Sequence, residues 1–153
     1  MEELLAGLDV EWERSGPRSW VVTLPGTRKL KTLCNIIEED HAVRLEAFVV
    51  RAPEENHAEL WRLLLRRNAQ MYGVAFAIDE HGDVYLMGRV SAAAIDAAEL
   101  DRLLGCVLRY SDDVFNTALE IGFASSITRE WRWRVERGEP TGNLAAFEHL
   151  RPE

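Results

Sequence analysis

The sequence predicts a single domain of the α+β class. Three observations support this prediction. The 153 residues and 17.4 kDa fit one hydrophobic core. Apolar residues alternate with polar ones through several short stretches, as in half-buried strands, and elsewhere they recur every three or four residues, as in amphipathic helices. We therefore expect residues 1–153 to form one domain without a linker.

The first half of the chain predicts a helix followed by three strands. Apolar residues recur at helical spacing from Met1 to Trp12, and Gly16-Pro17 is expected to end that helix. Alternating stretches at 20–24, 30–36 and 43–49 then predict a three-stranded meander, with turns at Pro25-Gly26 and at the acidic residues 38–40. The polar side of this meander, which we expect to face water, carries Lys29, Lys31, Arg44 and Glu46.

A second helix is predicted from Pro53 to about Asn68, with Glu54 and Glu55 complementing its dipole. Its apolar residues spread over about 200° of the helical wheel, roughly twice the arc that a helix needs to cover a sheet. Either this helix forms a second apolar contact, such as a subunit interface, or neighbouring elements bury it deeply. The candidate interface residues are Trp61, Arg62, Leu63 and Leu65.

A hairpin is the next predicted element. Alternation through residues 72–78 and 84–90 gives two strands, and the turn between them runs from Asp79 to Asp83. The small residues Gly73, Ala75 and Ala77 share one face of the first strand, which indicates the close approach of a helix or a partner.

Helices are expected to complete the chain. Asp96 and Glu99 form a capping box, and the helix that they begin is expected to extend to Gly122. A shorter helix containing Trp131 should end near Gly138, and Asn143 is expected to cap a last turn.

Charge and composition exclude several classes of function. The 18 basic and 26 acidic residues give a net charge of −8, which repels phosphate backbones and anionic lipids, so we expect neither a nucleic-acid nor a membrane partner. The longest apolar run, Val74 to Ile78, is far shorter than the roughly 18 residues of a membrane span. With no secretory signal at the acidic N-terminus, a cytoplasmic protein is expected. Cys34 and Cys106 lie too far apart to signal a zinc site or a disulfide framework, and we expect both to be buried.

No catalytic, metal or cofactor motif is found. Asp79, His81 and Asp83 carry side chains that can bind metal, but they lie on a hairpin turn, where Asp and Gly are favoured for their geometry. The acidic run at 38–40 is interpreted as a solvated turn for the same reason. Neither a Gly-rich phosphate loop nor a nucleophile signature occurs. The Arg- and Trp-rich stretch from Arg129 to Arg134 is interpreted as one side of a structural helix, because Trp131 and Trp133 would point about 200° apart.

The whole order of elements resembles the type III secretion chaperone-like fold, and the sequence is similar to the YbjN family of bacterial proteins, including its actinobacterial members. The resemblance is carried by residues 64–68, 71–77, 82–89, 101–105, Gly122-Phe123 and 129–131. It implies a two-layer α/β sandwich with an antiparallel five-stranded sheet, in the order α-β-β-β-α-β-β-α, followed by C-terminal helices. It further implies a homodimer without established catalytic residues. The family is described as a candidate regulator of sensory transduction, and the related chaperones hold extended segments of client proteins.

The leading functional hypothesis is a non-enzymatic, cytoplasmic protein-binding module, either chaperone-like or regulatory. It would recognise a protein partner through its sheet edge or through the apolar arc of the second helix. The alternative is a small-ligand sensor with a pocket between sheet and helices near Gly73, Ala75 and Ala77. An enzyme whose site is assembled only in space is the third hypothesis.

Overall fold

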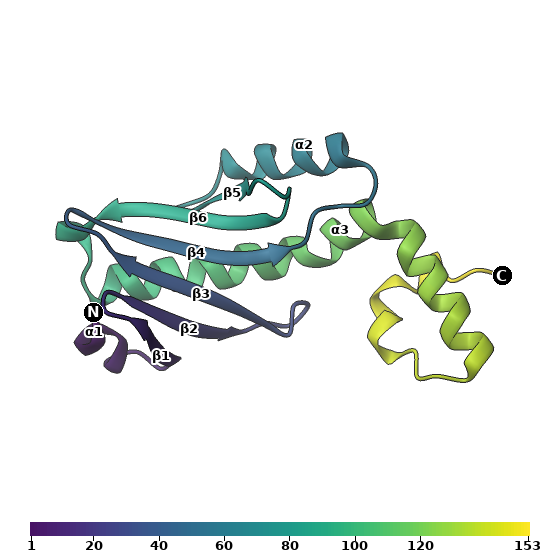
Figure 1. Cartoon of the computed structure of the whole chain (residues 1–153), viewed down its shortest axis with the longest axis horizontal. Helices are drawn as coiled ribbons and strands as arrows, with labels where there is room; N and C mark the ends of the chain where they lie inside the picture. The colour runs from purple at the N-terminus through teal and green to yellow at the C-terminus, as the bar shows by residue number, and fades with distance from the viewer.

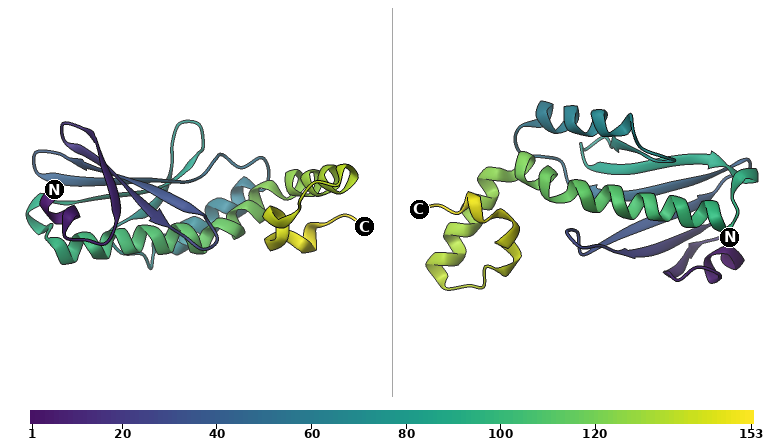
Figure 2. Two further views of the ribbon diagram at one scale, coloured as in Figure 1. Left: turned by 90° about the horizontal axis from the view of Figure 1, so that it is seen from below. Right: turned by 180° about the vertical axis from the view of Figure 1, so that it is seen from behind.

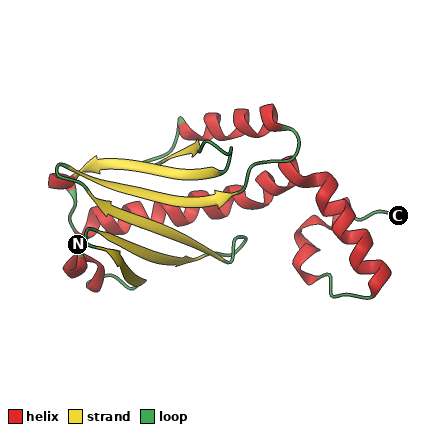
Figure 3. Ribbon diagram, in the orientation of Figure 1, coloured by secondary structure: helices red, strands yellow, loops and turns green.

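A computed structural model describes residues 1–153 as a six-stranded antiparallel sheet with helices on one face (Figures 1 and 3). The strands lie in the order β1-β2-β3-β4-β6-β5. They are β1 (Glu11–Gly16), β2 (Ser19–Pro25), β3 (Lys31–Glu38), β4 (Ala42–Val50), β5 (Ala75–Ile78) and β6 (Val84–Ser91). The helices are α1 (Glu2–Ala6), α2 (His57–Asn68) and α3 (Ala97–Arg137), with short 3₁₀ segments η1 (Ala92–Ala94) and η2 (Gly142–Leu150).

The α+β class and the two-layer arrangement are confirmed. Helix α3 runs under one face of the sheet, whereas no element covers the opposite face (Figure 2). Inward-facing side chains of the central strands, such as Ile36 and Leu45, are buried together with Leu103 and Val107 of α3. This alternation of buried and exposed positions along β2, β3 and β4 confirms the predicted meander.

The predicted opening helix is wrong beyond its first turn and a half, and the sheet has six strands rather than five. Helix α1 ends at Ala6, and Trp12 lies on β1 opposite Val22. Gly16-Pro17 ends no helix but belongs to the hairpin turn between β1 and β2. There the Arg14 guanidinium donates to the carbonyl oxygens of Gly16 and Pro17. Trp12 lies at a spacing that suits the apolar side of a helix and the inward side of a strand equally well. The spacing alone therefore led to the wrong prediction.

Helix α2 begins at His57, four residues later than predicted. Pro53 is not its first residue but packs against Gly122 of α3, where an added Cβ would lie 2.8 Å from the Pro53 Cβ. The backbone N–H groups of Glu54 and Glu55 both donate to the Gly122 carbonyl oxygen. This loop is therefore held by α3, and neither carboxylate complements the dipole of α2.

Helix α3 begins as predicted, because the Asp96 carboxylate accepts a hydrogen bond from the Glu99 N–H at 2.8 Å. It does not end at Gly122. Phe123 has non-helical backbone angles (φ −142°, ψ 21°), so α3 kinks there and continues to Gly138, whose left-handed φ of 66° ends it as predicted. The last turns form η2, which follows Thr141 without any side-chain cap, so the predicted cap at Asn143 is wrong.

Residues 123–150, which we name the C-terminal arm, project away from the sheet (Figure 1). The buried side chains of the arm continue the main hydrophobic core, and among them the Trp131 indole N–H donates to the Phe147 carbonyl oxygen at 3.0 Å. The buried apolar residues of the arm are Phe123, Ile127, Trp131, Leu144 and Phe147.

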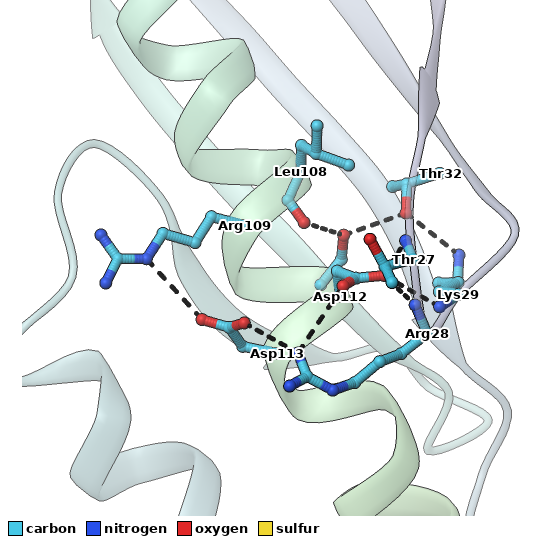
Figure 4. Close-up of polar contacts among 9 residues, drawn as sticks. Thr27, Arg28, Lys29, Thr32, Leu108, Arg109, Asp112 and Asp113 are labelled. Atoms are coloured by element: carbon cyan, nitrogen blue, oxygen red, sulfur yellow. Dashed lines mark hydrogen bonds and ion pairs between the residues drawn. The ribbon is translucent and has the colours of Figure 1, made fainter. Parts of the chain in front are cut away.

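A buried carboxylate fixes the β2–β3 loop to α3. One oxygen of Asp112 accepts hydrogen bonds from the backbone N–H groups of Thr27, Arg28 and Lys29 at 2.7–2.9 Å (Figure 4). Burial raises the pKa of Asp112, but these three donors and the Arg28 guanidinium outweigh that effect, and the pKa lies below its ordinary value. The carboxylate therefore stays ionised at neutral pH and holds the loop in place.

Candidate functional site

An apolar groove separates α2 from the edge strand β5. Its lining is entirely hydrophobic and encloses about 270 Å³. Leu64 and Phe76 form its buried floor, with exposed fractions of 4% and 7%. Leu65 and Ile78 stand on its two sides and leave 67% and 52% of their surfaces in water. The complete lining is Trp61, Leu64, Leu65, Phe76, Ala77 and Ile78.

Of the predicted interface residues, the structure places two beside this groove. Trp61 and Leu65 line it, whereas Leu63 is half-buried against the main core and Arg62 is exposed to water. The exposure of Leu65 shows that neighbouring elements do not bury the whole apolar arc of α2. Deep burial, the second explanation of that arc, therefore fails at this residue. The role of the four residues in an interface stays a prediction.

Asn68 protects part of the sheet edge at this groove. Its side-chain oxygen accepts from the Phe76 N–H at 2.7 Å, and its side-chain nitrogen donates to the Phe76 carbonyl oxygen at 3.0 Å. These two backbone groups face away from β6 and would otherwise be free to pair with another strand. At Phe76, a partner can therefore contact side chains more readily than it can extend the sheet.

No charged residue lines the groove. Of the charged residues next to it in the sequence, Asp79 accepts hydrogen bonds within its own turn, and Arg67 lines a separate hollow with Arg109 and Tyr110 of α3. The groove therefore offers a partner apolar contacts alone.

The space under the sheet is filled at Gly73, which counts against the alternative pocket near Gly73, Ala75 and Ala77. A Cβ added to Gly73 would lie 2.2 Å from the Leu103 Cδ2, because α3 packs directly against this glycine. The predicted close approach of a helix is thereby confirmed at Gly73. Ala77 alone of the three lines the groove.

The other candidates for chemistry have structural partners. Asp79 accepts from the backbone N–H groups of His81 and Asp83, and Asp83 accepts from the Ala52 N–H, as the turn interpretation predicts. No three His, Cys, Asp or Glu side chains lie together in a way that could hold a metal ion. Burial raises the pKa of the Cys34 thiol to about 12, so this cysteine is no nucleophile at neutral pH.

The acidic turn after β3 is likewise engaged in ion pairs. Asp40 pairs with Arg18 at 2.8 Å, and Glu39 pairs with Arg44 and Arg89. In the arm, Trp131 is buried and Trp133 is 44% exposed, so the two indoles form no common stacking surface, as predicted.

Sequence reasoning missed Asn68, Phe76 and Ile78 as parts of the groove. The pattern assigned Phe76 and Ile78 to one face of a strand, and it gave no sign that α2 would lie beside that strand. For Asn68, the only signal was its position: it is a polar residue at the end of an apolar helix, eight positions before Phe76.

A family model with the description "Putative bacterial sensory transduction regulator" matches residues 1–120. The chain belongs to the YbjN family. The match ends three residues before the kink at Phe123, so it covers the sheet and the first part of α3 but not the arm.

Two mycobacterial proteins are similar over most of the chain. The uncharacterized protein Rv0487 of Mycobacterium tuberculosis is 53% identical over 136 residues, which is 89% of this chain and 74% of that protein. The uncharacterized protein ML2442 of Mycobacterium leprae is 51% identical over 130 residues, 85% of this chain and 71% of that protein. Both matches are longer than residues 1–120 and therefore include part of the arm.

A solved structure shares the fold. A chain of the heterodimeric ExoU–SpcU complex, from the type III secretion system of Pseudomonas aeruginosa, superposes with a TM-score of 0.57 at 15% identity, covering 75% of this chain and 94% of that chain. A chain of the ExsC–ExsE complex matches with a TM-score of 0.47 at 19% identity, over 61% of this chain and 72% of that chain. The expected type III secretion chaperone-like fold is confirmed. None of the helices is both long enough and apolar enough to span a bilayer.

Proposed function

We propose that the chain is a non-enzymatic protein-binding module, chaperone-like or regulatory, that pairs with a second copy of itself through the groove between α2 and β5. The observation that carries the proposal is the all-apolar lining of this groove, with Leu65 and Ile78 exposed on either side. Exposed apolar surface of this kind is typical of association sites. The family description supports a regulatory role, and the ExoU–SpcU complex, built on the same fold, supports a protein partner.

A two-fold arrangement would cover the groove on both copies. In a symmetric dimer each surface meets an identical surface in the opposite direction. Leu65 and Ile78 lose their contact with water, which contributes roughly 25 cal/mol for each Å² of apolar surface buried.

The test is the molar mass in solution of Leu65→Glu, measured by light scattering after size-exclusion chromatography. We expect the wild type at twice 17.4 kDa and the variant at 17.4 kDa, because a buried carboxylate without a partner opposes association. Leu30→Glu is the matched control, since Leu30 is 85% exposed in the β2–β3 loop, away from the groove. A Leu65→Glu protein that keeps its fold and remains dimeric, or a monomeric wild type, contradicts the proposal.

A further inference from the structure

The uncovered face of the sheet carries a continuous apolar row. Leu33, Phe48, Tyr85 and Ala77 lie side by side on β3, β4, β6 and β5. The register pairs Phe48 with Tyr85 and Tyr85 with Ala77, and Leu33 precedes the Cys34–Ala47 pair. All four side chains point away from α3, because Cys34, Ala47, Leu86 and Phe76 beside them point into the core.

These side chains contact one another but remain open to water. The Phe48 and Tyr85 rings pack edge to face with centroids 5.6 Å apart. Leu33 and Phe48 nevertheless keep exposed fractions of 44% and 41%. In Figure 1 the sheet is viewed from this face, and no helix or loop passes over it. In the adjoining row, Met87 of β6 lies opposite Ala75 of β5.

The two lysines of the chain border this row, and neither has a carboxylate partner. Lys31 is exposed on β3, two positions before Leu33. The Lys29 ammonium lies at the end of the sheet, 5.7 Å from the Phe48 ring centroid and 5.9 Å from the ring of Phe115 on α3. It donates to the carbonyl oxygens of Phe48 and Lys31 and to the hydroxyl of the buried Thr32. By contrast, Glu46 in the adjoining row is paired with Arg44. Lys31 is therefore the lysine that this face leaves free for an anionic partner.

The open face restricts what kind of chain can cover it. Strands β3, β4 and β6 are paired on both sides within the sheet, and Asn68 occupies the outer backbone groups of Phe76 on the edge strand β5. An extended segment lying on the face would therefore leave its own N–H and C=O groups without partners. A helix satisfies its backbone internally and can present an apolar stripe. The row spans three strand spacings, about 14 Å, which corresponds to a helix of roughly ten residues.

We infer that the open face, at Leu33, Phe48, Tyr85 and Ala77, docks an amphipathic helix of a partner protein whose apolar stripe is flanked by acidic residues. Lys31 contacts the acidic flank, and the aromatic pair contacts the stripe. Ala77 also lines the groove, so the two sites adjoin at β5, but Leu33, Phe48 and Tyr85 lie outside the groove. The inference does not depend on the proposed self-association.

Two synthetic helical peptides test the inference. Both carry the same leucine stripe over fourteen residues, one with glutamate on its flanks and the other with lysine. We expect the glutamate peptide to bind at least tenfold more tightly in fluorescence anisotropy at low salt, and to shift the backbone amide signals of residues 33, 48 and 85 in NMR spectra. Leu33→Glu should abolish this binding, and Lys31→Glu should remove most of the preference for glutamate. Val135→Glu is the charge-matched control, because Val135 is exposed on the distant arm.

The outcomes separate this inference from the proposed function. Leu65→Glu should bind the glutamate peptide as the wild type does, whatever its oligomeric state. Equal affinity for both peptides, or signal shifts confined to the groove at residues 61, 65 and 78, overturns the inference. Binding to phosphatidylglycerol vesicles without binding to either peptide also overturns it, since the lysines would then serve a lipid surface.

Discussion

The sheet with the first part of α3 and the C-terminal arm are stabilised in different ways. In the first region, strands and helix enclose one large core, and the ionised Asp112 fixes a distant loop to α3. The arm extends this core at one end, around Trp131, and adjoins the rest of the chain at the kink. There Glu55 accepts hydrogen bonds from the N–H and the hydroxyl of Ser125, and Glu54 accepts from Ser126 and Arg51. The difference predicts that losing a polar contact at the kink affects the arm more than the sheet.

The largest effect should come from Gly73→Ala, in the first region. Gly73 has a left-handed φ of 72°, and the new methyl group would overlap Leu103. Strain and overpacking together should lower the free energy of unfolding by about 2–5 kcal/mol in urea titrations. Gly105→Ala is the control. It lies in α3 with open space around it, and the change should raise stability by up to about 1 kcal/mol. Equal effects of the two changes would contradict the packing described at Gly73.

Asp112→Ala should rank next, with a loss of about 2–4 kcal/mol, because three backbone N–H groups lose their acceptor. Asp113→Ala, one residue away, removes only exposed ion pairs with Arg28 and Arg109 and should cost less than about 1 kcal/mol. Thermal unfolding followed by circular dichroism distinguishes the two. Similar melting temperatures for both variants would show that the loop does not need its buried acceptor.

Glu55→Ala should affect the arm alone. The Glu55 carboxylate caps the helix that resumes after Phe123, and the loss of a cap costs about 1 kcal/mol. Hydrogen exchange should accelerate at the amides of residues 124–128, while the amides of β3 and β4 keep their protection. Glu59→Ala, on the exposed side of α2, should change neither region. Faster exchange throughout the sheet would mean that arm and sheet unfold as one unit.

The smallest effect is expected from mild acid. Because the pKa of Asp112 is lower in the folded chain than in the unfolded chain, its ionised form stabilises the fold fully above the ordinary carboxyl pKa of about 3.9. As the pH falls below that value, the unfolded chain binds the proton first, and this contribution is lost until the pH passes the folded pKa. Asp112→Asn should therefore lose less stability than the wild type between pH 6 and pH 3, measured as urea midpoints. Identical losses would exclude this carboxylate as the source.

Local signals in the sequence predicted most of the first region. Alternation located β2, β3, β4 and β6, and the capping box placed the start of α3 at the correct residue. The failure at Trp12 arose because one apolar residue satisfied two periodicities. The delayed start of α2 has another cause: Pro53 and Glu54 have a helix-start composition but contact Gly122, which is distant in the sequence.

The candidate groove was only half predictable. The helical wheel of α2 shows an apolar arc wider than the sheet requires, and this arc identified Trp61 and Leu65. The strand that lies beside this arc is β5, because β6 pairs with β4 and leaves β5 at the edge. This pairing joins residues far apart in the sequence, so no local pattern predicts it. The apolar row on the open face likewise depends on register between four strands and emerges only from the assembled sheet.

The uneven use of basic residues has a practical consequence. With lysine found only at positions 29 and 31, all side-chain amines of the chain lie at one end of the open face. Apart from the α-amine of Met1, an amine-reactive cross-linker will therefore attach only at these two lysines, near Leu33 and Phe48. Cross-links from lysine to a bound protein will report on this part of the chain rather than on the groove or the arm.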